Sequence, residues 1–101
     1  MELKTADVGT ILYASSGYDQ TQYTFYQITE RRGQSTMILR RLKTENKTEG
    51  WCQEIVRPLR GQFTDHPPLT RRVSKHGYAK AEAYEYLRLW DGKPKRATSY
   101  A

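Results

Sequence analysis

The sequence predicts a mainly β protein: a small barrel-like or strongly bent antiparallel sheet of five to six strands, with at most one short helical turn near residues 85–90. Two observations predict this class. Segments rich in β-branched and aromatic residues recur along the chain, and seven single glycines separate them at the spacing of turns. The 101 residues are expected to form a single domain, residues 1–101.

Aromatic side chains are expected to supply much of the core. Leu, Ile, Val and Phe together account for only 17 of the 101 residues, whereas eight Tyr and two Trp add large buriable surfaces. We therefore assign Phe25 and Trp51 to the core rather than to an exposed stacking face.

The first two strands are predicted as a hairpin over residues 8–16 and 22–30, both of which have strand composition. The turn between them, within the stretch GYDQTQYTFYQ, is expected to be braced by Asp19 and Thr21. A second turn around Gly33 leads to a strand over residues 36–42.

The middle of the chain alternates between polar and apolar segments. Residues 43–50 are polar enough to predict an exposed loop, and residues 51–59 alternate as a strand that Pro58 ends or places at a sheet edge. The adjacent prolines 67 and 68 predict an irregular excursion before a short basic strand over residues 70–74.

Residues 77–94 carry two competing patterns. Ala79, Ala83, Leu87 and Trp90 fit one helical face, while the alanines at 79, 81 and 83 alternate with charged residues as in a strand. We predict a strand over residues 78–84, then a helical turn near 85–90. Trp90 is predicted to pack, and a turn to form from Asp91, Gly92 and Pro94.

Charge is concentrated in the second half of the chain. Residues 51–101 hold ten Lys and Arg against five Asp and Glu, which is +5 of the total +6. Such a balance favours contact with a polyanion or an acidic protein. The predicted partner-binding cations are Arg40, Arg41, Arg71, Arg72, Lys75, Lys93, Lys95 and Arg96, and Tyr18 and Gln20 of the first turn are expected to contact the same partner.

The titratable residues do not predict catalysis. No pair among Asp19, Glu54, His66, His76 and Asp91 has a spacing that defines a known site, so a non-enzymatic protein is expected. One Cys and two His predict no metal site, and the lack of a glycine-rich phosphate loop predicts no nucleotide cofactor. With no apolar span or secretion signal in the sequence, the expected location is the cytoplasm of a bacterial host cell, without membrane contact.

Motifs at both ends of the chain resemble those of a group of small proteins encoded by bacterial phages, prophages and plasmids. They are GYDQT followed by FYQ, then TRRV, GY, LWDGKP and a terminal TSYA. The resemblance covers most of the chain and implies extended structure around Tyr78. It implies no activity, because the group has no established common function. Its members usually read SWGYDQT, whereas this chain has Ser16 before Gly17.

Two functions follow as hypotheses. The first is an accessory protein of a mobile element that binds a host protein or ribonucleoprotein through a basic surface, for example as an inhibitor of a nuclease or defence complex. The second is a small β-barrel that binds single-stranded nucleic acid by stacking bases on aromatic side chains beside Lys and Arg.

Overall fold

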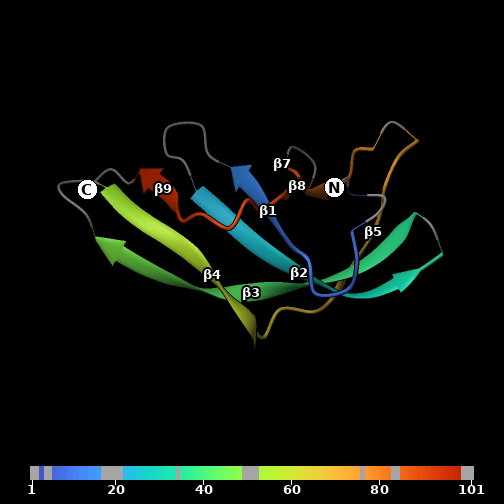
Figure 1. Cartoon of the computed structure of the whole chain (residues 1–101), viewed down its shortest axis with the longest axis horizontal. Coiled ribbons are helices and arrows are strands. Elements are labelled where there is room, and N and C mark those ends of the chain that lie inside the picture. Colours follow the sequence, from blue (N-terminus) through green and yellow to red (C-terminus); the bar gives the residue numbers. More distant parts are fainter. Residues whose placement is uncertain are drawn as a thin grey trace.

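A computed structural model describes residues 3, 6–16, 22–33, 35–48, 53–75, 77–82 and 85–98. These residues form nine strands and no helix (Figure 1). The strands are β1 (Ile11–Ser16), β2 (Gln22–Arg32), β3 (Thr36–Thr48), β4 (Gln53–Phe63), β5 (Leu69–Arg72), β6 (Lys80–Glu82), β7 (Glu85–Tyr86), β8 (Arg88–Leu89) and β9 (Lys95–Thr98).

The main sheet is antiparallel and follows the order β8-β1-β2-β3-β4-β9, with β5 attached to β3 beside β4. Strands β1 and β2 form the predicted hairpin, in register from Ile11 opposite Gln27 to Ser16 opposite Gln22. The path ends at β8 and β9 without closing, so the mainly β prediction is confirmed and its form is a strongly bent sheet rather than a barrel.

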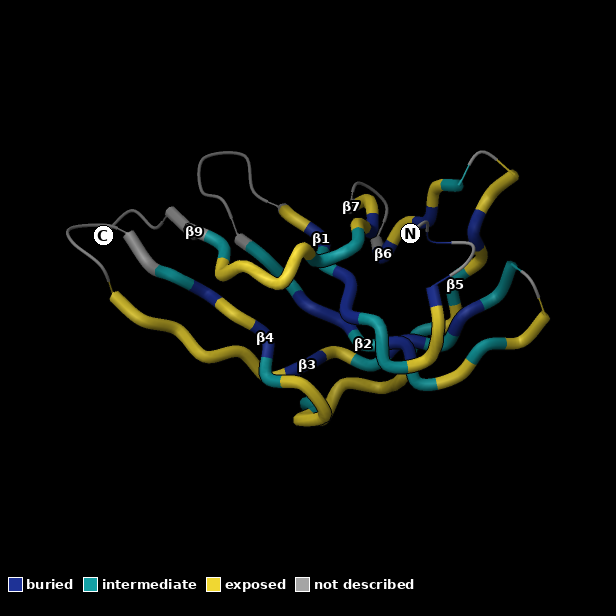
Figure 2. Tube along the Cα trace, in the orientation of Figure 1, coloured by how far each residue is buried: buried dark blue, intermediate teal, exposed yellow. Residues whose placement is uncertain are grey.

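The central strands β1 and β2 are buried on both faces. On the first face, Leu12 and Ile28 belong to a core cluster that Ala79, Ala81 and Leu87 complete from β6 and the β7–β8 region. This layer is separate from the main sheet, since β6 and β7 pair only with each other. Figure 2 shows the buried stretch running through the middle of the molecule.

The second face is covered by the sheet folding back on itself. Phe25 is fully buried there and packs with Ile11, Leu42 and Val56, so a side chain of β4 lies against the β1–β2 hairpin. Strand β9 follows the same curve, because the ammonium of Lys95 lies 4.6 Å from the ring centre of Tyr13 in β1. The bend in the sheet thus encloses an aromatic cluster.

Two details of the predicted elements are wrong. Residues 85–90 contain β7 and β8 in place of a helical turn, because the N–H of Leu87 donates to Ala79 O and the N–H of Trp90 to Ile11 O. These two long-range bonds use backbone groups that a helix would pair locally.

The other correction concerns β3, and the structure decides between the two alternatives predicted for Pro58 in β4. The predicted loop at residues 43–50 is strand as far as Thr48. Strand β4 also continues through Pro58 to Phe63, although its pairing with β3 shifts at that point, between Leu42 opposite Phe63 and Thr44 opposite Pro58. The proline therefore interrupts the regular ladder without ending the strand. It lies at a sheet edge, as the second alternative predicted, because β9 pairs with the other side of β4 only at Gln53–Val56.

Candidate partner-binding surface

The eight predicted cations fall into three separate places. Arg40 and Arg41 lie on β3, Arg71, Arg72 and Lys75 lie on or just after β5, and Lys93, Lys95 and Arg96 lie on β9 and the turn before it. The backbone of Arg96 is described, but its side chain is not. Tyr18, Asp19, Gln20, Thr21 and Trp51 lie outside the described residues.

Arg71 is engaged in holding the two layers together. Its Nε and Nη2 donate to Ala81 O at 3.0 and 2.8 Å, and its Nη1 donates to Thr70 O at 2.9 Å. Ala81 lies in β6, which has no backbone pairing with β5. The guanidinium therefore supplies the link between these strands, and most of its donors are unavailable to a partner.

The two cations of β3 also contact other side chains of the protein. The guanidinium carbon of Arg40 lies 4.7 Å from the ring centre of Phe63, and its Nε is buried without a hydrogen-bond partner among the described residues. Arg41 is exposed, and its Nη1 lies 3.3 Å from Nε2 of His66. Because they are on successive positions of one strand, the two side chains face opposite sides of the sheet.

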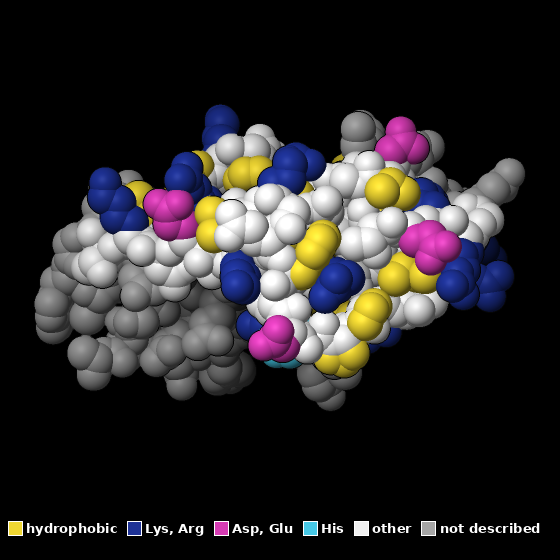
Figure 3. Space-filling view, turned by 90° about the horizontal axis from the view of Figure 1, so that it is seen from below, with side chains coloured by type: hydrophobic (Ala, Val, Ile, Leu, Met, Phe, Trp, Pro, Cys, Tyr) yellow, Lys and Arg dark blue, Asp and Glu magenta, His cyan; other side chains and the backbone are white. Residues whose placement is uncertain are grey.

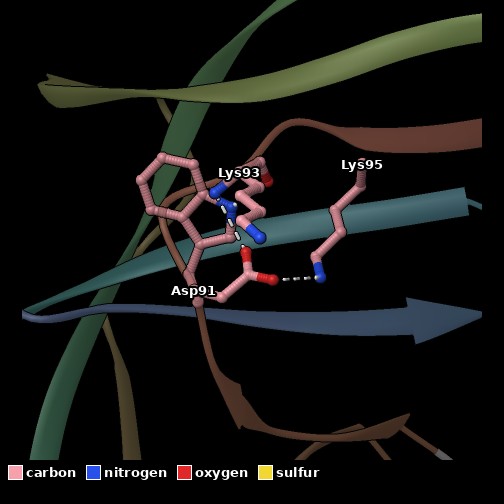
Figure 4. A network of polar contacts seen from close by, with 4 residues as sticks. Asp91, Lys93 and Lys95 are labelled. Carbon is pink, nitrogen blue, oxygen red and sulfur yellow. Dashed lines mark hydrogen bonds and ion pairs between the residues drawn. The ribbon is translucent and has the colours of Figure 1, made fainter.

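Lys95 belongs to a local network with the turn before β9 (Figure 4). Its Nζ lies 3.5 Å from Oδ2 of Asp91, and only 20% of its side chain is exposed. The other carboxylate oxygen, Oδ1, accepts the backbone N–H of Lys93 at 2.9 Å, while Trp90 Nε1 donates to Lys93 O at 2.8 Å. Gly92 has φ +85°, a left-handed conformation that favours glycine.

This network sets the protonation of Asp91 and the position of Trp90. The hydrogen bond from Lys93 N, and then the charge of Lys95, hold the pKa of Asp91 below its ordinary value of 3.8. The ring of Trp90 packs edge-to-face on Phe25, with 6.1 Å between ring centres. The motif LWDGKP therefore forms a turn that fixes an aromatic side chain against the second core cluster.

Among the predicted cations, Lys93, Arg72 and Lys75 have exposed side chains without a hydrogen bond or ion pair to another described residue. Lys93 lies in the turn before β9, apart from the other two, whereas Arg72 and Lys75 lie close together. They line a surface hollow of about 520 Å³ together with Ser35, Val73 and Ser74. The backbone holds this corner in place, since the N–H of Val73 donates to Ser35 O at 2.7 Å.

A third cation, Arg32, lies on the same face of the sheet as Arg72. Thr36 is opposite Arg32 of β2 and also opposite Arg72 of β5, so the two arginines share one face of the sheet. Among the described residues, Arg32 has only an exposed ion pair, with Glu30 at 3.6 Å. Figure 3 shows Lys and Arg side chains gathered at the end of the molecule where β2, β3 and β5 meet. We call Arg32, Arg72 and Lys75 the basic end.

An aromatic pair next to the basic end was not predicted as a site. Tyr78 and Tyr86 are 64% and 49% exposed and lie edge-to-face, with 6.2 Å between ring centres. They line a groove of about 370 Å³ with Gly77, Leu87 and Arg88, and the ammonium of Lys80 lies 5.0 Å from the ring centre of Tyr86.

Hydrogen bonds to Ser74 hold the backbone of Tyr78. Its N–H donates to Oγ of Ser74, its carbonyl accepts the N–H of Ser74, and the N–H of Gly77 donates to Ser74 O. The sequence signal here was the alternation of Ala79 and Ala81 with charged residues. In the structure the two alanines are buried, and Tyr78 and Lys80 are exposed.

The aromatic residues of β2 occupy the core instead. Phe25 and Tyr26 are buried in different clusters on opposite faces of the sheet, so they form no common stacking surface. Arg31 is likewise engaged, because its Nη1 donates to the carbonyl oxygens of Leu3 and Ala6.

No protein-family model, curated protein or solved structure matches this chain. Among the described residues, no group of three or more His, Cys, Asp or Glu side chains is placed to hold a metal ion. The described part of the chain also contains no helix of the length and apolarity needed to cross a membrane.

Proposed function

We propose that this chain is a non-enzymatic accessory protein of a bacterial mobile element that binds a host protein or ribonucleoprotein, and that the basic end is its contact surface. An inhibitor of a host nuclease or defence complex is the role that fits such a protein. The resemblance of its motifs to phage, prophage and plasmid proteins supports the mobile-element origin.

The observation that carries the proposal is the difference between the predicted cations. Arg40, Arg71 and Lys95 are engaged with rings, carbonyls or a carboxylate of the protein itself. Arg72 and Lys75 are exposed and unpaired among the described residues, with two serines beside them. Free cations attract an acidic partner over distance, and serine hydroxyls add hydrogen bonds on contact.

A matched pair of charge reversals tests this proposal. Lys75→Glu and Lys93→Glu each change an exposed lysine in a turn by the same two charges, but only Lys75 belongs to the basic end. The tagged protein is used to capture host proteins from nuclease-treated and untreated lysates. We expect Lys75→Glu to reduce capture of the bound component and Lys93→Glu to leave it unchanged. Equal loss in both variants, or loss only with Lys93→Glu, would refute the basic end as the contact.

Single-stranded nucleic acid is the second candidate ligand, and the Tyr78–Tyr86 pair favours it. An exposed tyrosine whose backbone is hydrogen-bonded to Ser74 offers a ring face to a base, and Lys80 and Arg88 lie where they can meet phosphates. Stacking on one aromatic ring contributes about 1–3 kcal/mol per base.

This candidate is tested by fluorescence anisotropy with a short single-stranded oligonucleotide at two salt concentrations. Binding that weakens steeply with salt, is reduced by Tyr78→Ala and is retained by Tyr78→Phe would support it, because phenylalanine keeps the ring. If the oligonucleotide does not bind, or if both substitutions act alike, base stacking on Tyr78 is refuted.

A further inference from the structure

The C-terminal half of β3 has an open edge. Strand β2 pairs with β3 only from Thr36 to Arg41, and β4 pairs with it on the other edge from Leu42 to Thr48. Over residues 43–48, therefore, no described strand is bonded to the edge that β2 has left. In Figure 1 this half of β3 is the outer strand of the wing that also contains β4 and β9.

The same six residues are uncovered on both faces. Every one of residues 43–48 is exposed, whereas the first half of β3 alternates between buried and partly buried positions (Figure 2). In an antiparallel ladder, alternate residues direct their N–H and C=O groups away from the paired strand. The open edge thus presents backbone donors and acceptors to any strand that can lie beside it.

The side chains along this edge are complementary to those of the same edge in a second copy of the chain. The sequence is Lys-Thr-Glu-Asn-Lys-Thr, from Lys43 to Thr48. When two copies run antiparallel with Asn46 opposite Asn46, Glu45 of each copy stands opposite Lys47 of the other. Thr44 and Thr48 then also stand opposite each other. Opposite charges and Thr–Thr pairs are both favourable across antiparallel strands.

Neighbouring registers do not have this property. With Glu45 opposite Glu45, Lys43 stands opposite Lys47, so every charged pair is a pair of like charges. With the symmetry axis between Glu45 and Asn46, each charged residue faces an uncharged one. A register centred on Thr44 also pairs opposite charges, Lys43 with Glu45, but it cannot extend to Arg41, whose edge is already paired with β2. The register centred on Asn46 is therefore the one that combines opposite charges with the longer stretch of open edge.

We propose that two copies of this chain associate through the open edge of β3, antiparallel and centred on Asn46. The pairing joins two wings into one continuous sheet in the order β9-β4-β3-β3-β4-β9. It is an isologous contact, since the same residues meet across a twofold axis. Glu45 already accepts two hydrogen bonds from Arg57 of β4 at its Oε2, which holds the carboxylate on the face where Lys47 of the second copy arrives.

A charge-swap cycle tests the pairing by sedimentation velocity over a concentration series of the full chain. The wild type is expected to form a dimer. Lys47→Glu places Glu45 opposite a glutamate at both symmetric positions, and we expect the dissociation constant to rise about tenfold or more. The double variant Glu45→Lys/Lys47→Glu restores opposite charges in the same register and is expected to regain the dimer, even though it loses the Glu45–Arg57 pair.

Circular dichroism and the melting temperature establish that each variant is folded. With the fold of each variant established, recovery of the dimer by the second charge reversal reports on the contact between the two copies. A monomeric wild type overturns the proposal. It is equally overturned by a dimer that Lys47→Glu leaves intact, or by a folded double variant that stays as weak as the single one.

Discussion

Two adjacent arginines of β5 are expected to have opposite importance for stability. Arg71 donates three hydrogen bonds to backbone carbonyls, whereas Arg72 is exposed with no bond to another described residue. Methionine in place of either keeps most of the apolar stem and removes the guanidinium. The comparison between Arg71→Met and Arg72→Met therefore isolates the hydrogen bonds of Arg71.

The magnitude follows from the number and exposure of these bonds. A hydrogen bond from a charged donor contributes about 1.5–3 kcal/mol when partly buried. Nε and Nη2 share one acceptor, Ala81 O, and the bond from Nη1 to Thr70 O is exposed. We therefore expect Arg71→Met to lower the free energy of unfolding by about 2–3 kcal/mol, including the cost of leaving Ala81 O without this donor.

Thermal unfolding followed by circular dichroism measures the difference. For a domain of this size, 1 kcal/mol corresponds to about 4–8 °C, so the melting temperature should fall by roughly 10–20 °C in Arg71→Met. Arg72→Met should stay within about 0.5 kcal/mol of the wild type, as an exposed substitution does. Equal melting temperatures for the two variants would refute the role of Arg71 as the link between β5 and β6.

Three further outcomes are expected from the turn before β9. Trp90→Phe keeps an aromatic ring against Phe25 but removes the donor to Lys93 O. The free energy of unfolding, measured with urea, should fall by about 1 kcal/mol, and an unchanged value would refute a stabilising role for this hydrogen bond and assign the contribution of Trp90 to packing. Gly92→Ala should lower the free energy of unfolding by about 1 kcal/mol from backbone strain alone, because φ is +85° and no atom lies within 4 Å of an added Cβ. An unchanged stability would contradict the left-handed turn. Because the pKa of Asp91 is lowered in the folded state, its ionised form stabilises the protein above the unfolded pKa, and this contribution is lost as the pH falls through the folded pKa. The stability difference between wild type and Asp91→Asn should therefore shrink on acidification below about pH 4, and a constant difference would refute it.

The strands were predictable mainly from composition. Residues of β1 and β2 are apolar or aromatic on both sides, since Leu12 and Phe25 lie in different core clusters, so alternation was a poor guide to these strands. The prediction of a loop, which includes residues 43–48, failed for the opposite reason. A strand exposed on both faces has no apolar positions, and its polar sequence is indistinguishable from that of a loop.

For the candidate site, the sequence predicted which residues carry positive charge but not which of them are free to bind a partner. Arg71 and Arg72 are chemically identical, and strand geometry places them on opposite faces, but the sequence does not say which face meets another layer. That depends on β6, whose Ala81 O lies next to Arg71. The exposed Tyr78 was missed because alternation separates it from Ala79 without saying which side another layer covers, and residue type alone does not separate a buried tyrosine from an exposed one.

The second core cluster and the open edge of β3 have a common cause. Leu42 packs with Phe25 and Val56, which requires the C-terminal half of β3 to cross the second face of the sheet and to leave β2. Burying each such side chain contributes about 1.5–3 kcal/mol, whereas a backbone hydrogen bond at an exposed edge contributes about 0.5–1.5 kcal/mol, because water replaces it. Core packing therefore outweighs continued pairing with β2, and the bend leaves residues 43–48 with an unpaired edge. At such an edge the backbone accepts any strand, so the alternating charges of Lys43, Glu45 and Lys47 decide which strand can bind there.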